Sequence, residues 1–77
     1  MNVPEAIDEA RRELAAGHDK EAARLLTDAV YATHDPEQEA EIRKLAEQGR
    51  EHAGRFGKGR WEEIIRIAEL RAAKGQG

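Results

Sequence analysis

Residues 55–70 decide the fold, and they read Arg-Phe-Gly-Lys-Gly-Arg-Trp-Glu-Glu-Ile-Ile-Arg-Ile-Ala-Glu-Leu. This stretch holds two of the three aromatic residues of the chain, Phe56 and Trp61, and its densest mixture of glycine and basic residues. A glycine-rich loop over residues 54–59 leads into a helix that we expect from about 60 to 74. Apolar residues cover more than one stripe of that helix. It therefore either lies at the centre of the core or buries a second face against another chain.

The apolar residues of this helix divide into two groups by their angular position. The inner group is expected to anchor the second half of the chain on the first, and it contains Trp61, Ile64, Ile65 and Ala68. Ile67 and Leu70 lie outside that stripe and, with Phe56 from the loop, form the candidate interface for a partner. The chain is short for an independently stable domain, so this apolar excess favours contact with another protein or with a second copy.

Three further amphipathic stretches precede this helix. They are expected at about residues 3–16, 20–33 and 36–53, each with apolar residues at helical spacing. Tyr31 extends the edge of the second apolar stripe. Because the connections are short, we expect one all-α domain of four helices in two antiparallel hairpins. The hairpins should cover about 3–34 and 35–74, and residues 75–77 should form a frayed tail.

Short signals mark the ends of these helices. Asn2, Asp19 and Asp35 are the expected N-caps, and Gly17 is the expected left-handed end of the first helix. Gly49 lies inside the third helix, where glycine costs about 1 kcal/mol relative to alanine. We expect a close crossing with another helix at this glycine, with a kink as the alternative.

Two segments share a pattern of their own. Residues 17–29 read Gly-His-Asp-Lys-Glu-Ala-Ala-Arg-Leu-Leu-Thr-Asp-Ala, and residues 59–65 read Gly-Arg-Trp-Glu-Glu-Ile-Ile. Both resemble the middle of a tetratricopeptide repeat, in which a glycine ends the turn and an aromatic residue follows two positions later. Trp61 fills that aromatic position in the second copy, whereas Asp19 replaces it in the first. Gly17 and Gly59 lie 42 residues apart, where the family repeats at about 34.

The resemblance implies a stacked pair of helical hairpins and a scaffold role, and it assigns no ligand-binding residues here. The residues themselves favour a compact, closed four-helix bundle as the first choice, because each helix has its own apolar stripe. A tetratricopeptide-like stack is the alternative arrangement.

The composition excludes several kinds of site. The 77 residues include no cysteine and no serine, which removes thiolate nucleophiles, thiolate metal sites and the commonest hydroxyl nucleophile. No two of the three histidines, His18, His34 and His52, have the i, i+4 spacing that places two metal ligands on one helical face. We therefore expect no enzyme activity, no catalytic residue, no cofactor and no metal site.

Hydropathy along the chain favours a cytoplasmic protein. No run approaches the roughly 20 apolar residues that span a membrane. The first five residues, Met-Asn-Val-Pro-Glu, do not have the basic and then apolar character of a secretory signal. Arginine outnumbers lysine by nine to four, an excess typical of high-GC bacterial genomes. We expect no contact with a membrane.

Charge is distributed unevenly. The net charge is −3, but residues 1–49 contribute −6 and residues 50–77 contribute +3. The basic part includes Arg55, Lys58 and Arg60, which form a candidate anion-binding site at the start of the last helix. Nucleic-acid-binding domains usually have a pI above about 9, whereas the pI here is about 5.6, so nucleic acid is an unfavoured partner. The asymmetry fits either a partner-facing end or two solvated faces that attract each other.

These patterns indicate a class of function. The chain is expected to be a small helical interaction or scaffold module without catalytic activity. Its partner is an unknown protein, and a homodimer is one form that the contact can take. The alternative is anion or nucleic-acid binding through the basic region from Arg50 to Arg60.

Overall fold

The computed structural model describes residues 2–54 and 57–76. Within them the chain forms four α-helices and no β-strand: α1 (Val3–Ala15), α2 (Asp19–Ala32), α3 (Pro36–His52) and α4 (Lys58–Gln76). The expected all-α class is therefore confirmed. Helix α4 begins at Lys58 and not at Arg60, because Gly59 takes up helical backbone instead of belonging to the loop. It also continues to Gln76, into the segment expected to fray.

Capping residues lie at most of the helix boundaries where the sequence predicts them. Asn2 and Asp35 each accept a hydrogen bond from a backbone amide in the first turn, at 3.2 and 2.9 Å respectively. Gly17 follows α1 with φ of 84°, the left-handed conformation that favours glycine. The predicted N-cap of α2 was wrong by one residue. Asp19 is the first residue of the helix, and its negative charge interacts favourably with the positive end of the helix dipole. His18 is the N-cap, and its side chain makes no capping hydrogen bond.

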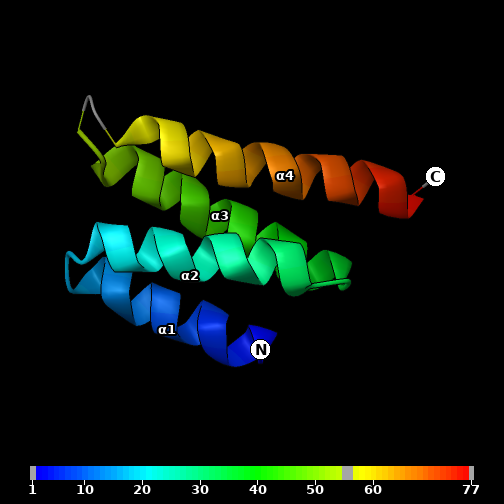
Figure 1. Cartoon of the computed structure of the whole chain (residues 1–77), viewed down its shortest axis with the longest axis horizontal. Helices are drawn as coiled ribbons and strands as arrows, with labels where there is room; N and C mark the ends of the chain where they lie inside the picture. The colour runs from blue at the N-terminus through cyan, green and yellow to red at the C-terminus, as the bar shows by residue number, and fades with distance from the viewer. Residues whose placement is uncertain (1, 55–56, 77) are drawn as a thin grey trace.

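The four helices form two antiparallel hairpins, α1 with α2 and α3 with α4 (Figure 1). Helix α2 packs on both helices of the second hairpin, and α3 packs on both helices of the first. Over the described residues α1 and α4 do not pack on each other. The molecule is accordingly flat, with extents of 35 × 25 × 15 Å. The two expected antiparallel hairpins are confirmed, and the contacts among the helices fit a compact all-α bundle.

One continuous core runs through both hairpins. Its buried members are apolar residues from all four helices: Ala6, Ile7, Ala10, Leu14, Ala22, Ala23, Leu25, Leu26, Ala29, Val30, Ile42, Leu45, Ala46, Trp61, Ile64, Ile65 and Ala68. The inner group predicted for the last helix is buried throughout, and only 2% of the Trp61 surface is exposed. The predicted role of Trp61 as a core anchor is therefore confirmed.

Gly49 of α3 faces the Trp61 ring of α4. A Cβ atom on Gly49 would lie 2.6 Å from three atoms of that ring. Carbon atoms attract each other best at about 3.5–4.0 Å, so the indole can lie against the α3 backbone only because residue 49 has no side chain. The predicted close crossing at Gly49 is confirmed, and α3 continues through it as one helix.

Candidate functional site

Helices α2 and α4 run in the same direction and pack together, so residues about 40 positions apart become neighbours (Figure 1). At their C-terminal ends, the Arg71 guanidinium of α4 donates hydrogen bonds to the carbonyl oxygens of Tyr31 at 3.1 Å and Thr33 at 2.8 Å. At their N-terminal ends, Lys20 and Arg60 line the same pocket. The Arg71 hydrogen bonds hold the register of the two helices at their C-terminal ends.

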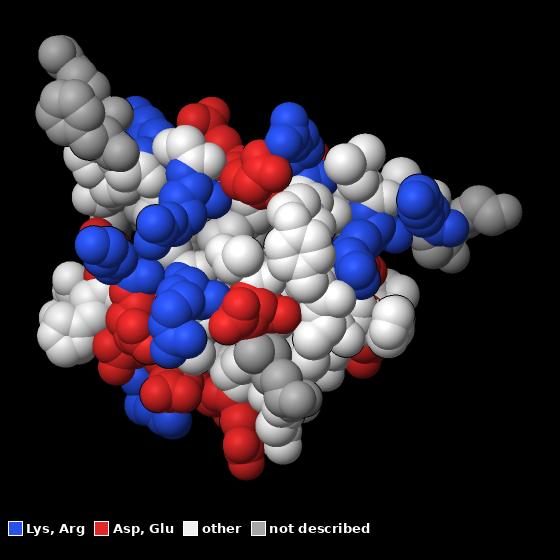
Figure 2. Space-filling view, viewed as in Figure 1, with Lys and Arg blue, Asp and Glu red and all other residues white. Residues whose placement is uncertain are grey.

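This register creates a surface that we call the α2–α4 face. It consists of residues that share one side of each helix: Lys20, Arg24, Thr27 and Tyr31 from α2, and Arg60, Glu63, Ile67 and Leu70 from α4. Figure 2 shows this face, with Lys and Arg gathered over the N-terminal ends of α2 and α4, and with uncharged residues in the middle that are flanked by Asp and Glu. The face therefore has a basic end and an apolar part.

Tyr31 and Leu70 dominate the apolar part. Among the described residues they are the two large hydrophobic side chains that are exposed, at 57% and 60%. Ile67, which the sequence places with Leu70 in the interface, is half-buried and packs against the core. Phe56, the third predicted interface residue, lies outside the described residues. The structure thus adds Tyr31, whose place at the edge of its stripe is the signal that could have indicated it.

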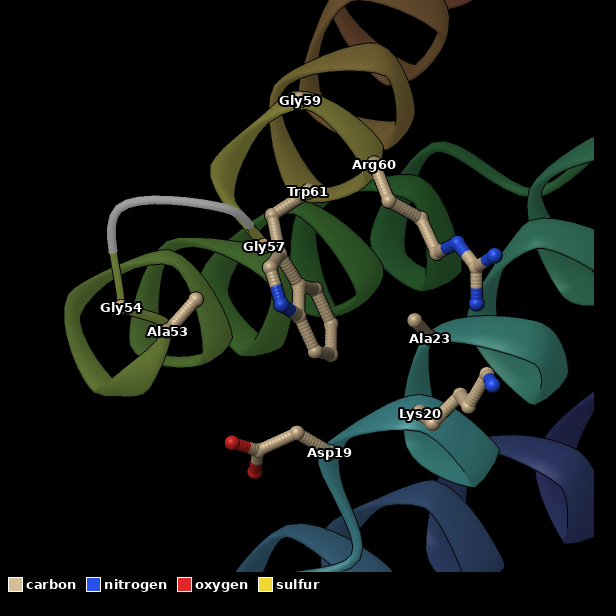
Figure 3. A pocket seen from close by; sticks show the side chains of 9 residues that line it. All are labelled: Asp19, Lys20, Ala23, Ala53, Gly54, Gly57, Gly59, Arg60 and Trp61. Atoms are coloured by element: carbon tan, nitrogen blue, oxygen red, sulfur yellow. The ribbon is translucent and has the colours of Figure 1, made fainter.

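Lys20 and Arg60 form the basic end. Figure 3 shows their side chains extending from α2 and α4 into the same space, on the far side of the Trp61 ring from the glycine loop. Both side chains are exposed, and within residues 2–54 and 57–76 neither forms an ion pair. A hollow of about 360 Å³ lies beside them, lined also by Arg24, Thr27 and Asp28. Two cations from different helices therefore share one solvent-filled space.

Arg24 differs from these two cations because it already has acidic partners. Its guanidinium bonds to the Glu21 carboxylate and lies 3.8 Å from the carboxylate of Asp28. The hydrogen bond lowers the pKa of Glu21 and raises the pKa of Arg24, because each charge stabilises the other. Arg24 consequently offers less unbalanced charge to a ligand than Lys20 or Arg60 does.

Two of the three residues of the predicted anion site lie within the described part of the chain. Arg60 lies at the basic end of the face, whereas Lys58 is exposed at the start of α4 and does not line either pocket. Arg55 lies outside the described residues. Sequence reasoning chose these three because they are close along the chain. It missed Lys20, which only the register of α2 against α4 brings to Arg60.

A second hollow, of about 400 Å³, opens at the loop end of the molecule. It is lined by Asp19, Lys20, Ala23, Ala53, Gly54, Gly57, Gly59, Arg60 and Trp61. Figure 3 shows the Asp19 carboxylate turned away from Lys20 and Arg60. One carboxylate oxygen of Asp19 is buried, and no described residue hydrogen-bonds to it. Asp19 therefore does not neutralise the two cations.

Two further observations bear on the kind of site. In the part of the chain that the structure describes, no three His, Cys, Asp or Glu residues gather closely enough to hold a metal ion. No helix formed by these residues combines the length and the apolar character needed to cross a bilayer. Comparison of the chain with protein-family models, with curated proteins and with solved structures gives no match.

Proposed function

We propose that this chain is a non-catalytic helical interaction module that binds another protein through the α2–α4 face. The observation that carries the proposal is the exposure of both Tyr31 and Leu70, on helices that Arg71, the neighbour of Leu70, joins through its hydrogen bond to the Tyr31 carbonyl oxygen. Aromatic side chains anchor many protein interfaces because they bury a large area with little loss of conformational entropy. Neighbouring exposed apolar side chains are characteristic of interaction surfaces.

The order in which the helices pack supports this function. Helices α1 and α3 pack on the other sides of α2, so the α2–α4 face has no helix of the described chain over it. A stacked pair of hairpins with a scaffold role, as the tetratricopeptide resemblance implies, would present such a face to a partner. Self-association through the same surface is one form of this proposal.

Site-specific photo-crosslinking tests the proposal. A benzophenone amino acid is placed at Tyr31, at Leu70 or at the exposed control position Ala40 on α3, and the protein is irradiated in its native cells. Adducts should form from positions 31 and 70 but not from position 40. An adduct of two copies of the chain would identify self-association. Equal labelling from all three positions, or none from 31 and 70, would contradict the proposal.

Anion binding at the basic end is the second candidate, favoured by the shared pocket of Lys20 and Arg60. Fluorescence anisotropy with labelled single-stranded RNA and DNA of 20 nucleotides tests it. Phosphate contacts are strongest at low salt, so binding at low ionic strength that is lost in Lys20→Glu would support this candidate. Absence of binding under those conditions would eliminate it.

A further inference from the structure

We infer that the α2–α4 face takes an amphipathic helix of about three turns whose apolar side meets Tyr31 and Leu70 and whose acidic end meets Lys20 and Arg60. This inference rests on the proposed function and adds the chemistry and orientation of the partner. It follows from the charge at one end of the face, from the length of the face and from the acids that border it.

Charge complementarity requires carboxylates at the basic end. Lys20 and Arg60 have no ion-pair partner within the described residues, and the acid nearest in sequence, Asp19, points elsewhere (Figure 3). Both helices also begin at this end, so both helix dipoles present their positive ends there. A partner with two or more Asp or Glu residues at one end would neutralise this charge and fix the direction in which it docks.

The length of the face sets the length of the partner. Eleven residue steps separate Lys20 from Tyr31 on α2, which corresponds to roughly 16 Å at 1.5 Å per residue. A helix of about three turns spans that distance and presents apolar side chains at i, i+4 and i+7 to the face. Leu70 and the exposed part of Ile67 provide the apolar contacts from α4, and Tyr31 provides those from α2.

The acids around the face favour a peptide over a nucleic acid. Asp28 lines the same hollow as Lys20 and Arg60, and the exposed Glu63 lies one turn along α4 from Arg60. A continuous phosphate backbone would approach these carboxylates after its first contact with the two cations. A peptide needs only a few acids at the end that reaches Lys20 and Arg60, and the rest of its length is uncharged, so Asp28 and Glu63 repel it less than they repel a continuous phosphate backbone.

A random library of 12-residue peptides displayed on phage provides the probe. After selection on the immobilised protein, enriched sequences should carry apolar residues at helical spacing and Asp or Glu clustered near one end. One enriched peptide is then synthesised with a fluorophore, and its affinity is measured by anisotropy. Lys20→Glu combined with Arg60→Glu should weaken binding by about tenfold or more, and so should Leu70→Gln. The matched charge reversal Lys44→Glu, on the exposed side of α3, should leave the affinity unchanged.

A charge swap sharpens this test. The same peptide with its acids replaced by lysine should bind the Lys20→Glu/Arg60→Glu variant better than it binds the unmodified protein. All substituted positions are exposed, so loss of folding does not account for weakened binding, and circular dichroism verifies each variant.

The outcomes separate this inference from the proposed function. Binding that depends on Leu70 but not on Lys20 and Arg60 overturns the inference and leaves the proposed function intact. Failure to enrich any peptide, or enrichment of peptides that ignore both sets of substitutions, counts against both. Low-salt binding of single-stranded RNA that Lys20→Glu abolishes would assign the basic end to nucleic acid and overturn the inference.

Discussion

Replacing Gly49 by alanine sets two physical effects against each other. Alanine favours an α-helix over glycine by about 1 kcal/mol, so helix propensity alone predicts a more stable protein. The new Cβ atom, however, would lie 2.6 Å from three atoms of the Trp61 ring. Trp61 is 2% exposed and cannot turn away without displacing other core residues.

The steric effect should prevail. Extra carbon atoms in a well-packed core typically cost about 1–3 kcal/mol, because neighbouring side chains leave their preferred rotamers or the helices move apart. After the gain in propensity is subtracted, Gly49→Ala should lower the free energy of unfolding by up to about 2 kcal/mol, with a central value of about 1 kcal/mol. A domain of this size has a total stability of only several kcal/mol, so the loss is easily measured.

Urea unfolding followed by circular dichroism at 222 nm provides the assay, in wild-type and Trp61→Phe backgrounds. The smaller ring removes the obstructing atoms, so Gly49→Ala should become neutral or stabilising in Trp61→Phe. Gly59→Ala is the matched control, because nothing lies within 4 Å of a Cβ atom at that helical glycine. A stabilising Gly49→Ala in the wild type, or an equal effect in both backgrounds, would refute the reasoning.

Three further predictions follow from single contacts. Gly17→Ala forces a side chain into a backbone with φ of 84°, and it should lower the free energy of unfolding by roughly 1–2 kcal/mol in urea titrations; an unchanged midpoint would show that the turn relaxes freely. Arg71→Met keeps the aliphatic stem but loses both hydrogen bonds to the C-terminal carbonyls of α2, so amide exchange there should accelerate and stability should fall by about 1 kcal/mol. The lowered pKa of Glu21 means that its interaction with Arg24 stabilises the fold above the ordinary glutamate pKa and is lost as the pH falls through the lowered value. Carbon-13 NMR should show this pKa rising in Arg24→Ala, and no rise would contradict the pairing.

Local signals in the sequence predict the elements of this fold well. Capping by Asn2 and Asp35 and the left-handed Gly17 depend on interactions within a few residues, so a sequence pattern is enough to recognise them. Gly49 was also interpretable, because a glycine in a helix interior needs a reason and close packing supplies one. The error at Asp19 is a shift of one residue, within the usual uncertainty of helix ends.

The candidate site was less predictable because it depends on how two helices are aligned. Lys20 and Arg60 are 40 positions apart, and no local sequence pattern indicates that they line the same pocket. The exposure of Ile67 likewise depends on tertiary packing, because Ile67 is half-buried against the core although the sequence groups it with the exposed Leu70. Helical periodicity gives the angle of a side chain around its own axis, but the neighbouring helix determines which angles are covered.

The pairing of helices that are adjacent in sequence has a consequence for folding kinetics. Contacts within each hairpin join residues that are near in sequence, so little loop-closure entropy opposes their formation and the chain should fold quickly. The outer helices α1 and α4 each pack on two others, whereas α2 and α3 each pack on three. Amide hydrogens of α1 and α4 should therefore exchange through partial opening, whereas those of α2 and α3 should exchange only through global unfolding. The protein loosens from its two edges inward, and the Arg71 hydrogen bonds to α2 restrain one of those edges.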